Sequence, residues 1–256
     1  MLNRIRIAQI KVYPIKADLD ANFESLLRLL DGLAAARPDV VVTPEGFLDG
    51  YAATEPRISA ASLGRLAVDP AASPYVDVAA SWAADARSWL VLGCARRVGR
   101  RAANSALVLD RSGRLVGAYD KTHLQAHDRK YVAGQALPVF ASDFGPFGVL
   151  ICADRRWPET VRTLALRGAR VIFNPTYGMH DQRNRQMMQT RSYESEVAIA
   201  FTHPGQSLVT GPAGEVLTDR RGPSPRWVLT EVDLSAVDRR RAGSSHLRDR
   251  RPELYA

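Results

Sequence analysis

One cysteine of this chain stands where a buried strand should end. In the segment Gly148–Glu159 (GVLICADRRWPE), the apolar run Val149–Ile151 is typical of a strand covered on both faces, and Cys152 follows it directly. Pro158 fits the first turn of a following helix. Backbone N–H groups at such a turn stabilise a thiolate or a developing oxyanion, so Cys152 is a candidate nucleophile. Free cysteines are also common as small buried hydrophobes, and this pattern alone leaves both interpretations open.

Two further residues with catalytic side chains follow predicted strands. Glu45 comes directly after the apolar run Asp39–Thr43, and Lys121 comes at the end of a predicted hairpin, Ser105–Tyr119. Open α/β sheets place their ligands at the carboxyl ends of strands. A thiol that attacks an amide needs a base for its proton and a cation near the oxyanion. Glu45 would be the base, and Lys121 would orient it and stabilise the oxyanion together with the backbone N–H of Ala153.

Cysteine content and hydropathy argue against export and against a membrane span. The only other cysteine, Cys94, lies inside the predicted strand Leu90–Arg97 with no base or helix start beside it, so a structural role is favoured. Two cysteines make no disulfide framework. The N-terminal MLNRIRIAQIKVYP alternates as a strand does and lacks the apolar core of a signal peptide, and no run approaches the roughly 18 apolar residues of a span. We expect a cytoplasmic protein without a membrane partner.

The chain is basic, and arginine supplies almost all of its positive charge. It has 256 residues and a net charge of +8, and only 4 of its 35 basic residues are lysines. Half of the excess lies in Asp219–Arg251, where 9 arginines face 5 acidic residues. A solvated basic C-terminal segment explains this pattern better than a nucleic-acid surface does, so no nucleic-acid partner is predicted.

Predicted elements alternate between strand and helix at first, and hairpins follow in the middle and near the end. No linker or repeat divides the chain, whose length suits one large α/β domain. This mixture favours two packed sheets with helices outside, in four layers. We expect residues 50–74 to be irregular and the chain to leave the core after Asp233. The predicted strands are 5–12, 39–43, 90–97, 105–110, 115–119, 148–151, 170–173, 197–202, 207–210 and 227–232, and the helices are 18–36, 75–89, 158–168 and 180–195.

Three motifs in order make the chain recognisable. PEGF (44–47), DKTHL (120–124) and ICADRRWPE (151–159) together resemble the nitrilase superfamily of carbon–nitrogen hydrolases, which carry a Glu-Lys-Cys triad. NPT (174–176), RSYES (191–195) and GPAGEV (211–216) resemble supporting elements of the same family, so the likeness covers about residues 3–235. It implies catalytic roles for Glu45, Lys121 and Cys152, an α-β-β-α sandwich over the single domain 1–256, and no metal or organic cofactor. It also implies a homodimer or higher homo-oligomer, with an extension of about residues 234–256 against a neighbouring subunit.

The segment after Lys121 departs from the family pattern. Many members have a second glutamate there that helps to position the substrate and the lysine. The resemblance puts Asp128 in that place, with one methylene fewer, and His127 is the alternative if the loop is aligned one residue differently. His123, inside the DKTHL motif, is expected to support the site by hydrogen bonding.

The doublet Arg155-Arg156 bears on the substrate. CADRRWPE resembles the segment of N-carbamoyl-D-amino-acid amidohydrolases in which two arginines engage the substrate carboxylate, and guanidinium groups suit a bidentate grip on a carboxylate. The alternative is that an arginine pairs with Asp154 or Glu159. We therefore expect a cysteine-dependent hydrolase of non-peptide carbon–nitrogen bonds, amide or ureido, that forms a thioester and releases ammonia or an amine. A small carboxylate-bearing amide or N-carbamoyl compound is favoured as its substrate; the alternatives are a nitrilase acting on nitriles and a non-catalytic binding module.

Overall fold

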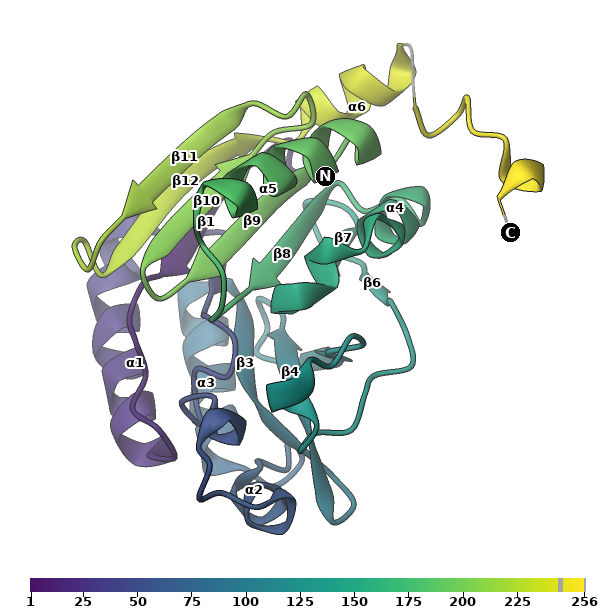
Figure 1. Ribbon diagram of the computed structural model, residues 1–256. Coiled ribbons are helices and arrows are strands. Elements are labelled where there is room, and N and C mark those ends of the chain that lie inside the picture. The colour runs from purple at the N-terminus through teal and green to yellow at the C-terminus, as the bar shows by residue number, and fades with distance from the viewer. Residues whose placement is uncertain (244–245, 256) are drawn as a thin grey trace.

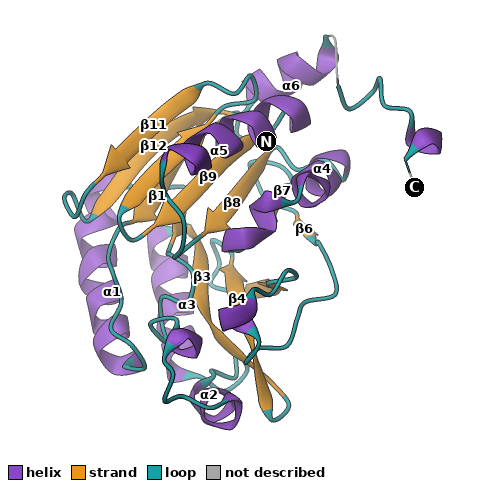
Figure 2. Ribbon diagram, in the orientation of Figure 1, coloured by secondary structure: helices purple, strands orange, loops and turns teal. Residues whose placement is uncertain are grey.

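The fold is a sandwich of two six-stranded sheets. The computed structural model describes residues 1–243 and 246–255. One sheet has the strand order β12-β1-β2-β3-β4-β5, and the other has the order β11-β10-β9-β8-β7-β6. Helices α1 and α3 cover the outer face of the first sheet, and α4 and α5 lie outside the second (Figures 1 and 2). The expected four-layer α-β-β-α sandwich is confirmed.

Most elements lie within a few residues of their predicted positions. The strands are β1 (Arg4–Ile10), β2 (Val40–Val42), β3 (Trp89–Val98), β4 (Arg101–Leu109), β5 (Leu115–Asp120), β6 (Val139–Phe140), β7 (Phe147–Val149), β8 (Val171–Pro175), β9 (Ala198–His203), β10 (Gln206–Thr210), β11 (Val216–Arg221) and β12 (Trp227–Asp233). The helices are α1 (Leu19–Leu33), α2 (Ala60–Leu66), α3 (Pro74–Ala86), α4 (Pro158–Leu166), α5 (Gln182–Ser195) and α6 (Ser235–Ala242). Short 3-10 turns include η2 (Ala52–Thr54), η3 (Ala126–Asp128) and η4 (Cys152–Arg156).

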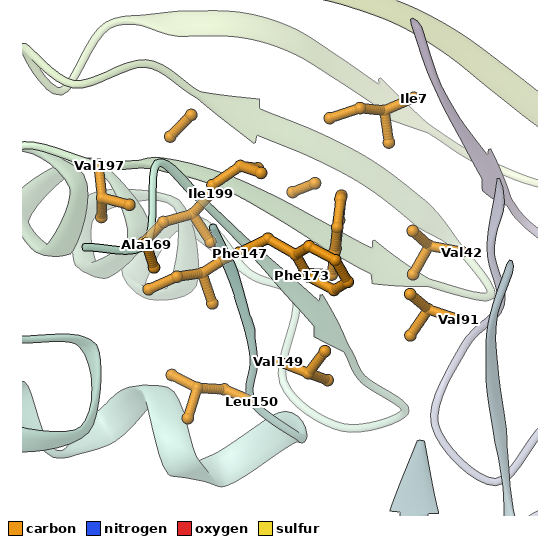
Figure 3. Packing of buried hydrophobic residues seen from close by; sticks show 14 of the residues in the cluster. Ile7, Val42, Val91, Phe147, Val149, Leu150, Ala169, Phe173, Val197 and Ile199 are labelled. Carbon is orange, nitrogen blue, oxygen red and sulfur yellow. The ribbon is translucent and has the colours of Figure 1, made fainter. Parts of the chain in front are cut away.

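Side-chain alternation explains how each strand serves two apolar layers. In β1, Ile5 and Ile7 belong to the cluster between the sheets, whereas Ala8 and Ile10 belong to the cluster under α1 and α3. The same alternation runs through β2, β3 and β4. Figure 3 shows the packing between the sheets, where Phe173 is among the labelled side chains. Because both of its faces are covered, the central parallel strand β2 is apolar at every position.

Four parts of the chain differ from the sequence-based expectation. Residues 50–74, expected to be irregular, contain α2, whose first turn is capped by Ser59. Strands β6 and β11, the two edges of the second sheet, were not predicted, because β6 has only two residues and four of the six side chains of β11 are polar. The expectation that the chain leaves the core after Asp233 is wrong for α6, because Leu234 and Val237 are buried in the core cluster. Beyond α6, Leu247 still packs against the core cluster, and the C-terminal end of the chain extends away from the sandwich (Figure 1).

The topology brings several strand ends together. Strands β1, β2 and β3 run parallel in one sheet, and β7, β8 and β9 run parallel in the other. The loops that follow β2, β5, β7 and β8 carry the polar residues discussed below. Among the described residues, no helix is long and apolar enough to cross a membrane.

Candidate active site

Cys152 occupies a tight turn after β7. The backbone of Cys152 has φ +48°, in the left-handed region that non-glycine residues rarely adopt and that costs of order 1–3 kcal/mol. The amide of Asn174 donates to the carbonyl of Leu150 (2.9 Å), which ties the strand before the cysteine to β8. Helix α4 begins at Pro158, as predicted, but the 3-10 turn η4 separates it from Cys152. Cys152 is 5% exposed.

Glu45 is held by a loop that packs closely on β3. A Cβ at Gly93 would lie 2.2 Å from the carbonyl oxygen of Pro44, so only glycine permits this approach. Glu45 is fully buried. Its Oε1 accepts hydrogen bonds from Asn104 Nδ2 and Lys121 Nζ, both at 2.8 Å, and its Oε2 accepts from the Tyr177 backbone N–H at 2.9 Å. Both carboxylate oxygens are therefore fixed by donors from three different segments.

Lys121 lies between two carboxylates. Its Nζ is 2.8 Å from Glu45 Oε1 and 2.6 Å from Asp128 Oδ2, and all three side chains have no exposed surface. Burial disfavours the ammonium charge, but Glu45, Cys152 and Asp128 outweigh it, so the pKa of Lys121 is raised above its ordinary value. Lys121 is therefore a permanent cation at this position.

Asp128, rather than His127, is the residue that contacts Lys121. The hydroxyl of Tyr51 donates to Asp128 Oδ1 at 2.5 Å, and the backbone N–H of Gln125 donates to Oδ2 at 3.1 Å. The side chain of His127 is about half exposed, and its Nε2 lies 3.8 Å from Asp128 Oδ2. The shorter aspartate reaches Lys121 because the 3-10 turn η3 carries it inward.

The electrostatics of Cys152 favour a neutral thiol at rest. Burial raises the pKa of the Cys152 thiol and the charge of Glu45 raises it further, whereas Lys121, Arg155 and the Tyr177 N–H lower it, with a net increase. The thiolate expected from a helix N-terminus is thus not the resting form. Glu45 is the carboxylate whose charge contributes to this raised pKa.

The segment Thr176–His180, here called the strap, was not singled out from the sequence beyond its NPT start. The backbone N–H of Tyr177 hydrogen-bonds Glu45 and also interacts with the Cys152 sulfur. A Cβ on Gly178 would lie 3.4 Å from Cys152 Sγ, at ordinary contact distance, although Gly178 itself is exposed. The strap therefore borders the approach to the thiol. Asn104 and Tyr51 were also missed, because neither belongs to a motif.

His123 and Ala153 belong to the turn that supports the nucleophile. Asp154 accepts from the backbone of Ile151 (3.0 Å) and from the backbone of His123 (2.9 Å). The His123 ring lies 3.1 Å from Asp154 through Nδ1 and stacks on Trp157, and the bond to Asp154 raises its pKa. Ala153 is buried directly after Cys152 in the same turn.

Arg155 is buried inside the protein, whereas Arg156 is exposed to solvent. Arg155 is 1% exposed, and its guanidinium donates to the Cys152 carbonyl, to the Met179 carbonyl (2.8 Å) and to Asn184 Oδ1 (2.7 Å). Arg156 is exposed, and its backbone carbonyl accepts from Arg191 at 2.9 Å. The charge of Arg155 is thus directed at backbone carbonyls around the nucleophile. Among the residues described, no group of three or more His, Cys, Asp or Glu side chains is arranged to hold a metal ion.

The buried Glu45, Lys121 and Cys152 at converging strand ends belong to a chain that is similar to known proteins over most of its length. Residues 4–242 match the model of the carbon-nitrogen hydrolase family. This chain belongs to the carbon-nitrogen hydrolase family. It is 28% identical to a nitrilase of Pyrococcus abyssi over 98% of this chain and 99% of that protein. It is also 28% identical to an N-carbamoylputrescine amidase of Solanum lycopersicum, over 59% of this chain and 62% of that protein.

A solved structure agrees with this placement. The sandwich superposes with a TM-score of 0.80 on a mutant amidase of Nesterenkonia sp. AN1, at 22% identity over 98% of this chain and 95% of that chain. That structure shows covalent addition of the acetamide moiety of fluoroacetamide at the active site cysteine. The likeness confirms the nitrilase-superfamily fold.

Proposed function

We propose that this hydrolase cleaves the carbon–nitrogen bond of a small amide or ureido substrate through a thioester on Cys152. The observation that carries the proposal is the buried arrangement around Glu45, whose Oε1 accepts from Lys121 at 2.8 Å and whose charge acts on the Cys152 thiol. A neutral thiol, a fixed base and a permanent cation are the groups that this reaction requires.

The reaction proceeds in two halves. Glu45 takes the proton of Cys152 as the sulfur attacks the substrate carbon, and the Lys121 ammonium and the Ala153 N–H stabilise the oxyanion. When the C–N bond breaks, the leaving nitrogen takes that proton from Glu45, and a thioester remains. Glu45 then takes a proton from water as the water oxygen attacks the thioester carbon. When the C–S bond breaks, Glu45 returns that proton to the sulfur, so the acid leaves and both the Cys152 thiol and the Glu45 carboxylate are restored. Asp128 stabilises the charge of Lys121 throughout, and His123 supports the turn through Asp154.

For the substrate, we propose a small carboxylate-bearing amide or N-carbamoyl compound. The Arg155-Arg156 doublet supports a carboxylate through the exposed Arg156, because the Arg155 guanidinium already donates to protein acceptors. The similarity to an N-carbamoylputrescine amidase supports a ureido group. A nitrile is the second candidate, because the match to the nitrilase of Pyrococcus abyssi spans 99% of that protein.

Ammonia release and intact mass test the proposal together. We would assay the protein with ω-amides, N-carbamoyl amino acids, N-carbamoylpolyamines and nitriles. Turnover of at least one amide or ureido compound, with an acyl adduct on Cys152, is expected. Cys152→Ala should abolish both, whereas the buried Cys94 provides the matched control, and Cys94→Ala should keep turnover. Turnover of nitriles alone would reassign the substrate class, and full activity of Cys152→Ala would contradict the proposal.

A further inference from the structure

The last residue of β9 hydrogen-bonds the strap that borders Cys152. His203 is 1% exposed, and its Nε2 lies 2.9 Å from the carbonyl oxygen of Tyr177. Its Nδ1 accepts from the backbone N–H of Gly205, also at 2.9 Å. Because a carbonyl can only accept and an N–H can only donate, these partners assign the proton of the neutral ring to Nε2.

The Tyr177 backbone connects this histidine to the reacting groups. The carbonyl of Tyr177 accepts from His203, and the N–H of the same residue donates to Glu45 Oε2 at 2.9 Å and interacts with the Cys152 sulfur. The strap is also tied to β9 by the backbone N–H of Thr176, which donates to the Thr202 carbonyl at 2.8 Å. The Tyr177 N–H is thus shared between Glu45 and Cys152. Its direction depends on how the Tyr177 carbonyl, which follows it in the chain, is held by His203.

The surroundings of His203 keep its ring neutral. The ring stacks on His180 (centroids 4.0 Å apart) and on Phe201 (6.1 Å), and the ring of Tyr13 meets it edge-on at 6.0 Å. Burial lowers its pKa to about 4, and the charges of His180 and Arg155 act in the same direction. A protonated ring would still donate to the Tyr177 carbonyl but would lose the acceptor for Gly205, so only the neutral tautomer satisfies both partners.

We propose that His203 is a positioning residue for proton transfer from Cys152 to Glu45, acting through the backbone of Tyr177. By fixing the Tyr177 carbonyl, it aims the preceding N–H at the point between carboxylate and sulfur, where that donor stabilises each group as it becomes charged. The proposal rests on the proposed roles of Glu45 and Cys152. It extends the site to a residue on β9 that lies outside the three motifs.

Two amide substitutions separate the two hydrogen bonds. His203→Gln can place an N–H near the position of Nε2 and so keep the donor to Tyr177, but it loses the acceptor for Gly205. His203→Asn can keep an acceptor near Nδ1 for Gly205, but it is too short to reach Tyr177. Both remove the titrating ring, so each serves as the matched control for the other.

The readout is the rate at which iodoacetamide alkylates Cys152, measured by mass spectrometry near pH 7.5, beside kcat and KM on any substrate that turns over. We expect His203→Asn to slow alkylation about tenfold and to lower kcat with little change in KM, as for the loss of one charge-assisted hydrogen bond. His203→Gln should stay within about threefold of the native protein.

Equal losses in both variants, in proportion to a lowered Tm, would overturn the proposal, as would native rates in both. Alkylation needs no substrate, so a failed assignment of the reaction would not mask the result.

Discussion

The chemistry of single residues here depends on burial. Glu45, Lys121 and Asp128 have no exposed surface, so water does not screen the attraction of Lys121 to the two carboxylates. The pair of carboxylates keeps Lys121 charged, and burial together with the charge of Glu45 keeps the Cys152 thiol neutral.

The base is tested by a substitution of equal size. Glu45→Gln removes the proton acceptor while keeping a side-chain oxygen for Lys121 or Asn104. We expect kcat to fall by roughly 10²–10⁴-fold, the usual contribution of a general base. Acylation measured by stopped flow should slow by the same factor. A variant with near-native kcat would show that another group takes the proton.

The arginine doublet is tested by comparing an acid substrate with its neutral amide analogue. Arg155→Ala leaves the carbonyls of Cys152 and Met179 without a buried donor, so it should lower stability by about 1–3 kcal/mol and reduce activity on both substrates. A selective loss on the acid identifies whichever arginine grips the carboxylate. If neither Arg155→Ala nor Arg156→Ala discriminates between the two substrates, the carboxylate-bearing substrate is contradicted.

His203 also gives a stability prediction with a defined sign. Its pKa is lowered from 6.5 to about 4, so between these pH values the folded protein binds fewer protons there than the unfolded chain. The free energy of unfolding should fall as pH drops through that window, by at most about 3 kcal/mol from this group. Urea titrations at pH 7 and pH 5 should show a smaller decrease for His203→Gln. Asp49, whose pKa is raised to about 6 by burial, acts in the opposite sense in both proteins and cancels in the comparison.

At the scale of elements, the site depends on strands that let loops approach closely. Strand β3 has no side chain at Gly93, and the loop that carries Glu45 lies in that space. The strained turn at Cys152 is likewise held by neighbours, through Asn174 on β8 and Asp154 within η4.

Gly93→Ala tests this close approach. Its Cβ would lie 2.2 Å from the Pro44 carbonyl, so the loop must shift and carry Glu45 with it. We expect a loss of about 1–3 kcal/mol in stability, as for overpacking, and a drop in kcat of tenfold or more. Gly32→Ala in α1, where nothing lies within 4 Å, is the control and should be neutral or slightly stabilising. Native kcat in Gly93→Ala would show that the loop position is unimportant.

At the scale of the whole molecule, we propose that the chain assembles as a homodimer or larger homo-oligomer. Trp157 and Leu166 beside and on α4, and Tyr193 on α5, are each more than a third exposed. Leu254 and Tyr255 in the C-terminal segment are also exposed, and this segment extends from the sandwich (Figure 1). Exposed apolar side chains of this kind would be buried against another subunit in an oligomer.

Light scattering tests the assembly. We expect a mass of at least twice 28.1 kDa at micromolar concentration. Removing the residues after α6 should weaken the assembly, whereas Leu217→Ser on β11, an exposed position elsewhere, should leave it unchanged. A stable monomer would contradict the proposal.

The sequence by itself determined the family, the sandwich and the three motif residues. The apolar runs before Glu45, Lys121 and Cys152 are local signals, because the hydrophobic pattern of a short stretch predicts a buried strand and its end. The contact between Glu45 and Lys121 was predicted from their strand ends, and the structure has it at 2.8 Å.

Tertiary structure decided which other side chains reach these residues. Asn104, Tyr51 and His203 come from segments with no chemical signature, and they reach the site only because strand register and loop packing bring them there. The buried state of Arg155 and the raised pKa of Cys152 likewise depend on what covers them. The burial and the hydrogen-bond partners of a side chain depend on residues far away in the sequence. The local pattern around a motif therefore cannot predict them.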